Sequence, residues 1–338
     1  MKLEKAFNPV QDGILFASIM HSERIPGVSS NRRKMRYQRT IGRVASCGGV
    51  GLHTGEPSTL RFIPAPVDTG IIFIRKKDGH KRYIRAEAAR VISTDFSTTL
   101  GNEGISVKTV EHLLAALAGL RIDNLYIEVE GEEIPIMDGS AWPFVKLLQE
   151  ARIVRQGKLQ PHLKIEKTIV VSEGDRSIQV SPSNHFAITY TMNFNHALFR
   201  GQGYCYRDDE GEFIQKISKA RTFGFLKDVE GLRSKGLIRG GSLENAVVIG
   251  EHGVMNEEGL RYPDELVRHK ILDLMGDLAL LGKPLMGELT VHQAGHSLHT
   301  ELVSAILKNK DAWVLIEDTE ESFPSLMPTR WAVAPGNS

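Results

Sequence analysis

The stretch DELVRHKILDLMGDLALLG, residues 264–282, places His269, Asp273 and Asp277 at intervals of four. Four residues advance an α-helix by about 400°, so these side chains are expected on nearly the same helix face. Apolar residues cover much of the remaining surface and predict a largely buried helix: Leu266, Ile271, Leu272, Leu274, Met275, Leu278 and Leu281. Buried carboxylates and imidazoles need polar partners. A divalent metal suits both, and a His–Asp hydrogen bond along the helix face is the alternative.

A second stretch, SVKTVEHLLAALAG, predicts a helix over residues 108–119 that carries Glu111 beside His112. Neighbouring residues on a helix lie about 100° apart, so the two cannot ligate one metal in the same way. His112 could bind the metal while Glu111 reaches a water on it from the side. The alternative is that Glu111 complements the helix dipole and His112 is a hydrogen-bonded core residue.

A third cluster, HQAGHSLHT, contains His292, His296 and His299. Alternation along the preceding strand predicts His292 on that strand and His296 in the loop after Gly295. A histidine just past a strand end is well placed for catalysis. The spacing does not select one of the three, and the other two are expected on the surface.

Taken together, His112, His269 and Asp273 form a set of two histidines and one aspartate that leaves a coordination position open for water. Hydrolytic zinc sites require such an opening, because the metal lowers the pKa of its water towards about 7 and an adjacent carboxylate takes the proton. The chain contains no HExxH sequence, which disfavours a zincin-type protease.

Two halves of the chain repeat one order of predicted elements: strands, a helix with His and acidic residues, a strand, and a second helix. Strand-like segments cover residues 40–46, 58–65, 70–76, 124–131, 162–172, 176–183, 186–194, 287–295 and 312–318, and further helices are predicted at 141–151, with Ser140 as cap, and at 299–309. This order predicts an α+β fold of two similar domains, residues 39–157 and 162–320, with a boundary near residues 155–161. Residues 224–256 have no counterpart in the first half and are predicted to be an inserted strand–helix–strand.

Bulk properties exclude several classes of protein. The chain has 338 residues, 41% hydrophobic and 25% charged, so it is long enough for two packed domains. A formal net charge of +1 disfavours nucleic acid as a partner. Only Cys47 and Cys205 are cysteines, which fits a reducing cytoplasm, and no apolar run approaches the roughly 18 residues of a membrane span.

Both ends of the chain differ from the rest. Basic residues cluster behind the apolar run GILFASIM, at Arg32, Arg33, Lys34, Arg36, Arg39 and Arg43. Residues 1–38 are expected to be a basic, disordered extension or the product of a start codon upstream of Met35, with a transit peptide as the alternative. Residues 321–338 are expected to be a short polar tail without a further domain.

Several long motifs occur in order across both halves: GVGLHTG, TVEHLLAALAGL, IDN, EIPIMDGSA, KARTFGF, VRHKILDLMGDL and GHSLH. Together they resemble the UDP-3-O-acyl-N-acetylglucosamine deacetylase family, from about Gln38 to Asp318. Family members catalyse the committed deacetylation of lipid A biosynthesis. The resemblance implies zinc-dependent hydrolysis of the acetamide of UDP-3-O-acyl-N-acetylglucosamine.

The resemblance also implies roles for particular residues. The zinc ligands fall on His112, His269 and Asp273, and the general base falls on Glu111. The catalytic histidine falls on His296, with Asp277 as its carboxylate partner. Thr222 matches the threonine that supports the developing oxyanion, and the substrate contacts fall on Lys270, Leu52, Phe223 and Gly241.

The family fold implies two domains, each a small mixed sheet layered with two helices, with the active site between them. The insertion is expected to form an apolar passage for the acyl chain. We expect one zinc ion per chain, with iron(II) as the alternative in the cell, and a cytoplasmic monomer without stable membrane insertion. The N-terminal extension departs from typical bacterial members. Two other functions remain open at this point: another zinc-dependent amidohydrolase, and a binding protein with structural zinc.

Overall fold

The computed structural model describes residues 36–193, 201–209 and 211–317. Most of the predicted basic extension (residues 1–38) and the whole predicted tail (residues 321–338) therefore lie outside the described residues. No helix within the described ranges is long and apolar enough to cross a membrane.

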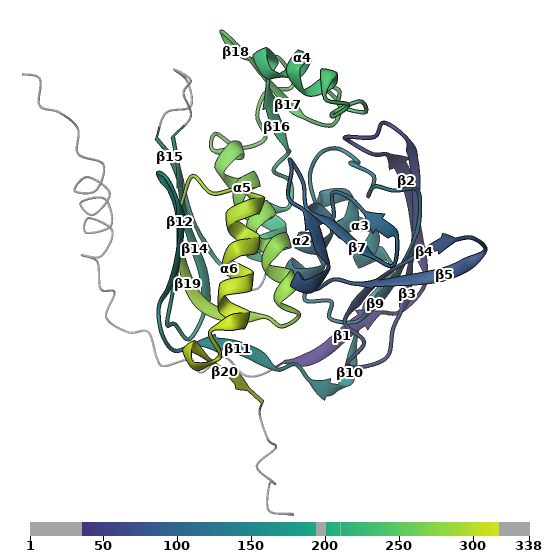
Figure 1. The fold of residues 1–338 in the computed structure, drawn as a ribbon, viewed down its shortest axis with the longest axis vertical. Coiled ribbons are helices and arrows are strands. Elements are labelled where there is room, and N and C mark those ends of the chain that lie inside the picture. Colours follow the sequence, from purple (N-terminus) through teal and green to yellow (C-terminus); the bar gives the residue numbers. More distant parts are fainter. Residues whose placement is uncertain (1–35, 194–200, 210, 318–338) are drawn as a thin grey trace, which may run out of the picture. The chain divides into compact units, whose positions relative to one another are not determined.

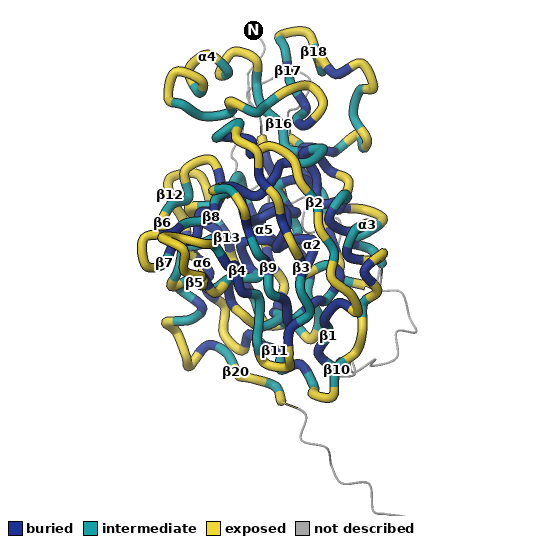
Figure 2. The backbone as a smooth tube through the Cα atoms, turned by 90° about the vertical axis from the view of Figure 1, so that its right-hand side faces the viewer, coloured by how far each residue is buried: buried dark blue, intermediate teal, exposed yellow. Residues whose placement is uncertain are grey.

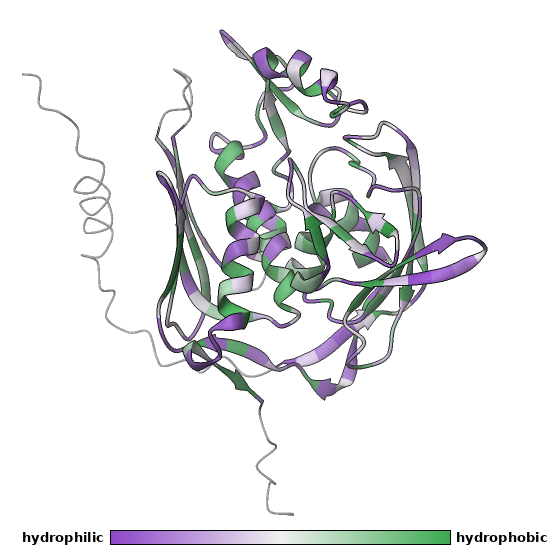
Figure 3. Ribbon diagram, viewed as in Figure 1, coloured by the Kyte–Doolittle hydropathy of each residue, from purple (hydrophilic) through white to green (hydrophobic). Residues whose placement is uncertain are grey.

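The first main sheet contains five strands: β2 (Ala45–Val50), β3 (Pro57–Pro64), β9 (Leu125–Glu130), β4 (Ile71–Lys77) and β5 (His80–Arg85), in that spatial order. Only β4 and β9 run parallel, so the sheet is mixed. Along β3 every second residue is buried, as expected for a strand with one face on a core. Leu60 and Phe62 are the fully buried residues of this face. Figure 3 shows that the β4–β5 hairpin, which extends from this sheet, is largely hydrophilic.

The second main sheet repeats this arrangement. Its strands β12 (Ile169–Glu173), β13 (Arg176–Ser181), β19 (Leu285–His292), β14 (Phe186–Met192) and β15 (Gln202–Arg207) pair in that order. Here only β14 and β19 run parallel within this set. In each half of the chain, the first strand pairs with the last. In the first half β1 (Tyr37–Ile41) pairs with β10 (Ile153–Leu159), and in the second half β11 (His162–Ile165) pairs with β20 (Trp313–Ile316).

The equivalence of the two sheets supports the repeat inferred from element order. Both have the strand before the second helix at their centre, with an antiparallel neighbour (β3 or β13) and a parallel neighbour (β4 or β14). They differ in that β19 also pairs in parallel with β11, so β11 and β20 belong to the second sheet, whereas β1 and β10 form a separate sheet. The predicted α+β class with mixed sheets is confirmed. The domain limits stay a prediction, and the residues proposed as the boundary lie partly in β10, which is paired with β1.

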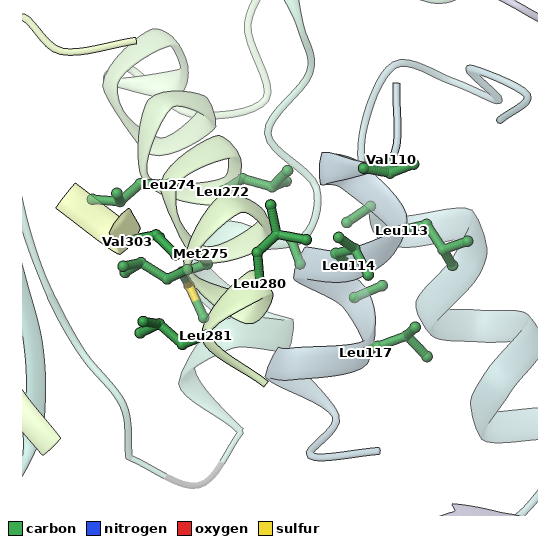
Figure 4. Packing of buried hydrophobic residues seen from close by; sticks show 14 of the residues in the cluster. Val110, Leu113, Leu114, Leu117, Leu272, Leu274, Met275, Leu280, Leu281 and Val303 are labelled. Atoms are coloured by element: carbon green, nitrogen blue, oxygen red, sulfur yellow. The ribbon is translucent and has the colours of Figure 1, made fainter. Parts of the chain in front are cut away.

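Four helices lie between the two main sheets: α2 (Glu111–Gly119), α3 (Trp142–Glu150), α5 (Glu265–Leu278) and α6 (His296–Lys308) (Figure 1). The buried parts of the chain concentrate on these helices and on the sheet faces that they cover (Figure 2). Figure 4 shows the apolar packing between α2 and α5, in which Leu113, Leu114 and Leu117 lie on one helix and Leu272 and Met275 on the other.

Several predicted boundaries were wrong for local reasons. The strand expected at 40–46 is two strands, because the chain turns at Gly42, whose N–H faces the carbonyl of Arg152 at 2.6 Å. The strand expected at 162–172 is also two strands, β11 and β12. The helix expected from residue 108 begins at Glu111, because Thr109 has a left-handed φ of 57° that an α-helix excludes. Ser140 is not the cap of α3, although its Oγ accepts the N–H of Trp142 at 3.2 Å.

Two small sheets lie outside this repeat. The first contains β6 (Val91–Ser93), β7 (Thr99–Asn102) and β8 (Ile105–Val107). The second belongs to the predicted insertion and contains β16 (Phe223–Phe225), β17 (Val247–Gly250) and β18 (Gly253–Val254), with α4 (Leu226–Ser234) between its first two strands. Val247 and Ile249 of β17 pack against Leu266 at the start of α5, so the insertion has a small core of its own.

Candidate active site

His112 of α2 and the pair His269 and Asp273 of α5 converge in the interior. Oδ1 of Asp273 lies 3.2 Å from Nε2 of His269 and 3.6 Å from Nε2 of His112. All three side chains are nearly inaccessible, with 2–4% of their surface exposed. Within the described residues, Oδ1 of Asp273 is buried and accepts no hydrogen bond. A buried carboxylate oxygen that faces two imidazole nitrogens without a hydrogen bond is a donor set that fits a divalent metal.

Neighbouring groups fix the orientation of these side chains. Nδ1 of His269 lies 3.1 Å from the carbonyl oxygen of Ala220, so this nitrogen donates and Nε2 is left to face Asp273. A backbone carbonyl on the far nitrogen is the usual way to orient a metal-binding histidine. Lys270 donates from Nζ to the other carboxylate oxygen of Asp273 at 2.8 Å. The pKa of Asp273 is well below its ordinary value, because His269 and Lys270 outweigh the opposing effect of burial.

A glycine allows α2 and α5 to cross closely enough to form this cluster. A Cβ atom at Gly276 would lie 2.1 Å from the carbonyl oxygen of Glu111, which is closer than any side chain tolerates. Gly276 is one helical turn beyond Asp273 and immediately precedes Asp277. The close approach therefore occurs where α5 carries Asp273 and Asp277 and α2 carries Glu111 and His112.

A second polar cluster lies beside the ligand set and contains Glu111, Asp277 and His296. Nδ1 of His296 donates to Oδ2 of Asp277 at 2.7 Å, and its Nε2 lies 3.7 Å from Oε1 of Glu111. The imidazole of His296 thus stands between two carboxylates from two different helices. Burial lowers the pKa of His296, but Asp277 and Glu111 outweigh it and raise the pKa to about 9. Burial also raises the pKa of Glu111, while His296 and His299 hold the pKa of Asp277 at about 2 against the effect of burial.

Two expectations about the histidine cluster of residues 292–299 were wrong. His296 is not in a loop: it is the first residue of α6, which begins directly after Gly295. His299 is not on the surface, since it is fully buried and its Nδ1 donates to Oδ2 of Asp277 at 2.8 Å. Residues 296 and 299 lie one helical turn apart, so both reach the same carboxylate oxygen. Had the helix been predicted from Gly295 onwards, this spacing would have indicated that His296 and His299 share one face.

A cavity of about 190 Å³ opens beside the ligand set and the acid–base cluster. Its lining contains most residues that the sequence singled out: Leu52, Glu111, His112, Thr222, Phe223, His269, Lys270, Asp273 and His296. Asp277 is not part of the lining because it lies behind His296, and Gly241 is not part of it either. Gly241 is nonetheless close to Leu52, whose Cδ1 would lie 3.5 Å from a Cβ at that position.

Sequence reasoning missed three residues of the lining: His53, Phe96 and Thr109. His53 follows Leu52 in the motif GVGLHTG, and the backbone of this loop is held by the buried carboxylate of Glu133, which accepts the N–H groups of His53 and Thr54 at 2.9 and 2.8 Å. Burial lowers the pKa of His53. Phe96 and Thr109 both have left-handed φ angles, 60° and 57°, a backbone feature that a single sequence does not reveal.

Thr222 is held in place by a buried ion pair next to it. Arg221 is 1% exposed and its Nε donates to Oε1 of Glu265, at the start of α5, at 2.9 Å. Glu265 also accepts the backbone N–H of Arg221 at 3.0 Å. The N–H of Thr222 in turn donates to the carbonyl of Gly139 at 2.7 Å, in the motif MDGSA. The segment KARTF is therefore anchored on both sides, which fixes where the side chain of Thr222 can lie.

The chain is similar to known proteins of one family. The family model described as "LpxC: UDP-3-O-acyl N-acetylglycosamine deacetylase" matches residues 38–308. Proteins named UDP-3-O-acyl-N-acetylglucosamine deacetylase are similar along most of their length. The one from Myxococcus xanthus is 46% identical over 279 residues, covering 82% of this chain and 89% of the relative. That from Saccharophagus degradans is 47% identical over 290 residues, covering 85% and 96%, and that from a Geobacter species is 45% identical over 289 residues, covering 86% and 95%.

Proposed function

This chain belongs to the UDP-3-O-acyl-N-acetylglucosamine deacetylase family, and we propose that it hydrolyses the acetamide of UDP-3-O-acyl-N-acetylglucosamine to UDP-3-O-acyl-glucosamine and acetate. This is a step of lipid A biosynthesis. The observation that carries the proposal is a cavity with a metal-binding donor set on one side and a carboxylate and an imidazole next to it. Amide hydrolysis needs a base, an acid and a carbonyl activator, and each has a candidate in this cavity.

We assign the metal to His112, His269 and Asp273, which leave a coordination position open. The family is one of metalloenzymes, and zinc is the metal we propose because two imidazoles and one carboxylate are a common donor set of hydrolytic zinc sites, with iron(II) as the alternative in the cell. When bound there, the metal would lower the pKa of a water and polarise the acetyl carbonyl. The remaining steps fall to side chains of the chain itself.

Glu111 is the proposed general base. Its Oε2 accepts the N–H of Thr98 at 3.1 Å, so the carboxylate is held on one side while Oε1 points towards His296. It neighbours a ligand in the sequence without belonging to the donor set, and it lines the cavity. In this position it can take the proton of the attacking water as the water adds to the acetyl carbon.

His296 is the proposed general acid. With a pKa of about 9, its imidazole carries a proton at neutral pH. The protonated ring stabilises the developing negative charge on the acetyl oxygen and then gives the proton from Nε2 to the amine nitrogen as the C–N bond breaks. An amine leaves poorly unless it is protonated, so this acid is needed in addition to the base. Asp277 keeps the positive charge on the ring, and Thr222 adds a neutral hydrogen bond to the same oxygen.

The insertion is the proposed site of the acyl chain. The apolar side chains of α4 and of residues 235–238 are all at least partly exposed, so the protein core does not use them: Leu226, Val229, Leu232, Leu237 and Ile238. Phe223 lines the cavity and belongs to β16, which leads directly into α4. A cavity of about 190 Å³ is smaller than an ordinary small-molecule pocket, so we expect the acyl chain and the nucleotide to extend outside it. Lys270, Leu52 and Gly241 are the further proposed substrate contacts.

The proposed function is tested with purified full-length protein assayed for acetate release from UDP-3-O-acyl-N-acetylglucosamine. The metal content is measured on the same sample, and chelation followed by zinc or iron(II) addition identifies the metal that restores activity. Turnover of other acylated amines but not of this substrate would favour a different amidohydrolase, and metal without any turnover would favour a structural zinc protein. Light scattering of the same sample tests the proposed monomer, and fractionation of cells tests the proposed cytoplasmic location.

A further inference from the structure

Thr98 is a fully buried residue whose three polar groups all contact catalytic elements. It precedes β7 directly and belongs to neither cluster described above. Its carbonyl accepts the N–H of Val110 at 3.2 Å, at the start of α2. Its N–H donates to Oε2 of Glu111, and its hydroxyl donates to Oδ1 of Asp277 at 2.5 Å.

On the side of Asp277, the hydroxyl of Thr98 completes the set of donors around one carboxylate. Oδ2 accepts the Nδ1–H groups of His296 and His299, and Oδ1 accepts the hydroxyl. Without this hydroxyl, Oδ1 would be a buried anionic oxygen that has lost the donor Thr98 gives it. The carboxylate could then rotate, and the orientation of the imidazole of His296 depends on it.

On the side of Glu111, the N–H of Thr98 holds one oxygen and leaves the other towards Nε2 of His296, 3.7 Å away. A glutamate has three rotatable side-chain bonds, so a fixed donor is needed to hold its carboxylate in one place. Thr98 is itself stiff because its side chain is β-branched. Thr98, Glu111, His296 and Asp277 thus form a closed ring. In this ring Thr98 and His296 each lie between the carboxylates of Glu111 and Asp277.

We propose that Thr98 is a positioning residue that holds the carboxylates of Glu111 and Asp277 at a fixed separation. The proposed base and the proposed acid then act on the acetamide of the substrate from defined positions. This inference rests on the proposed deacetylase reaction for its kinetic consequence. Its structural part is the restraint of Asp277 and of His296, whose Nδ1 lies 2.7 Å from Oδ2 of Asp277 and 3.3 Å from the hydroxyl of Thr98. This part does not depend on the reaction or on the metal.

The kinetic test compares Thr98→Val, which removes the hydroxyl but keeps the shape and the N–H, with Thr98→Ser, which keeps the hydroxyl. We expect Thr98→Val to lower kcat about ten- to a hundredfold with little change of KM, because a donor to a buried charged group is lost while substrate contacts remain. Thr98→Ser should recover most of the loss. Thr99→Val is the matched control, since Thr99 is the adjacent buried threonine and its hydroxyl contacts neither carboxylate.

A double-mutant cycle separates positioning from a general loss of packing. In an Asp277→Ala background, which removes the carboxylate, Thr98→Val should cost much less than in the wild type, because the restraint has lost its target. Equal losses in both backgrounds, or a normal kcat for Thr98→Val while His296→Ala is inactive, would overturn the proposal and leave the deacetylase function standing.

A measurement without substrate or metal tests the structural part. In metal-free protein labelled with ¹⁵N-histidine, the Nδ1 proton of His296 should give a downfield signal, which a His296→Gln variant assigns. Thr98→Val should broaden this signal or shift it upfield, and Thr98→Ser and Thr99→Val should not. An unchanged signal in Thr98→Val would contradict the proposal even if the chain proved inactive on the proposed substrate. If Thr98→Val does not fold, the same comparison is made with Thr98→Ala.

Discussion

Gly276 of α5 lies against the backbone of Glu111 at the start of α2, so closely that a methyl group at position 276 would be 2.1 Å from the carbonyl oxygen of Glu111. The candidate metal ligands and the proposed base belong to the two helices that meet here, α2 and α5. The proposed acid belongs to α6 beside them. Residue 276 therefore controls how near the two halves of the site come to each other.

The first prediction is that Gly276→Ala pushes the two helices apart. We expect a loss of stability on the order of 1–3 kcal/mol, because a rigid backbone atom is the obstacle, together with weaker metal binding. Urea unfolding and metal analysis measure the two effects. Gly231→Ala is the control, since Gly231 lies within α4 with nothing within 4 Å of an added Cβ, and it should be neutral or stabilising. Normal stability and metal content in Gly276→Ala would show that the crossing can relax.

The second prediction concerns the metal ligands. Replacement of any two of His112, His269 and Asp273 by alanine should abolish metal binding, because one remaining ligand cannot retain the ion. His296→Ala and Glu111→Ala should keep about one metal per chain while losing roughly 10²–10⁴ in rate, the usual range for a positioned acid or base. Elemental analysis of each purified variant checks both statements. A metal-free His296→Ala protein, or one with full activity, would contradict the role given to this histidine.

The third prediction concerns pH. The proposed mechanism requires Glu111 unprotonated and His296 protonated, so kcat/KM should follow a bell whose alkaline side lies near pH 9, the pKa of His296. Asp277 raises this pKa, so Asp277→Asn should move the alkaline side to lower pH as well as reduce the maximum. Asp311→Asn, at an exposed carboxylate paired with Lys167, should leave the profile unchanged. An alkaline side that stays in place in Asp277→Asn would exclude His296 as the group that titrates there.

The fourth prediction concerns His299. Burial lowers its pKa, so it stands as a neutral donor to Asp277, and His299→Leu should leave this carboxylate with one donor fewer. The cost should be about 1–3 kcal/mol in stability, accompanied by a lower kcat. His299→Asn can present an N–H near the position of Nδ1 and should recover part of both. His292→Asn, at a partly exposed histidine of β19, is the comparison, and similar damage there would remove the special role of His299.

The fifth prediction concerns the insertion. If its apolar side chains hold the acyl chain, each CH₂ should contribute about 0.8 kcal/mol, which is roughly a fourfold change of kcat/KM per CH₂ within the length that the passage holds. Leu232→Ser should weaken long-chain substrates and leave short-chain ones unaffected. Equal turnover of short and long acyl chains by the unaltered enzyme would mean that the insertion serves another purpose.

The sequence was informative where chemistry and periodicity coincide. The spacing of four residues predicted that His269 and Asp273 lie on one face of a helix. The second helix with a histidine and an acidic residue indicated that His112 is the third ligand. The structure brings these three side chains together. The repeat of elements was also visible, because strands and helices alternate in the same order in both halves.

Features that depend on tertiary contacts were not visible. Thr98 looks like any strand threonine, and Gly276 looks like an unfavourable helix residue until the carbonyl of Glu111 is seen beside it. His299 was misplaced on the surface because the start of α6 was set three residues late. The choice of His296 among three histidines came from family resemblance, since no local pattern distinguishes it.

The two main sheets share a set of five strands in the same order, and their equivalent helices, α2 and α5, meet face to face. Such a contact between like elements is what a symmetric homodimer would have at its axis. In a homodimer, any substitution at that axis appears on both sides at once. A single chain with two copies of the unit is free of this restriction, so one copy can hold a base and a ligand while the other holds two ligands and the partner of an acid. The asymmetry that amide hydrolysis demands is thus accessible to a chain that contains the same unit twice.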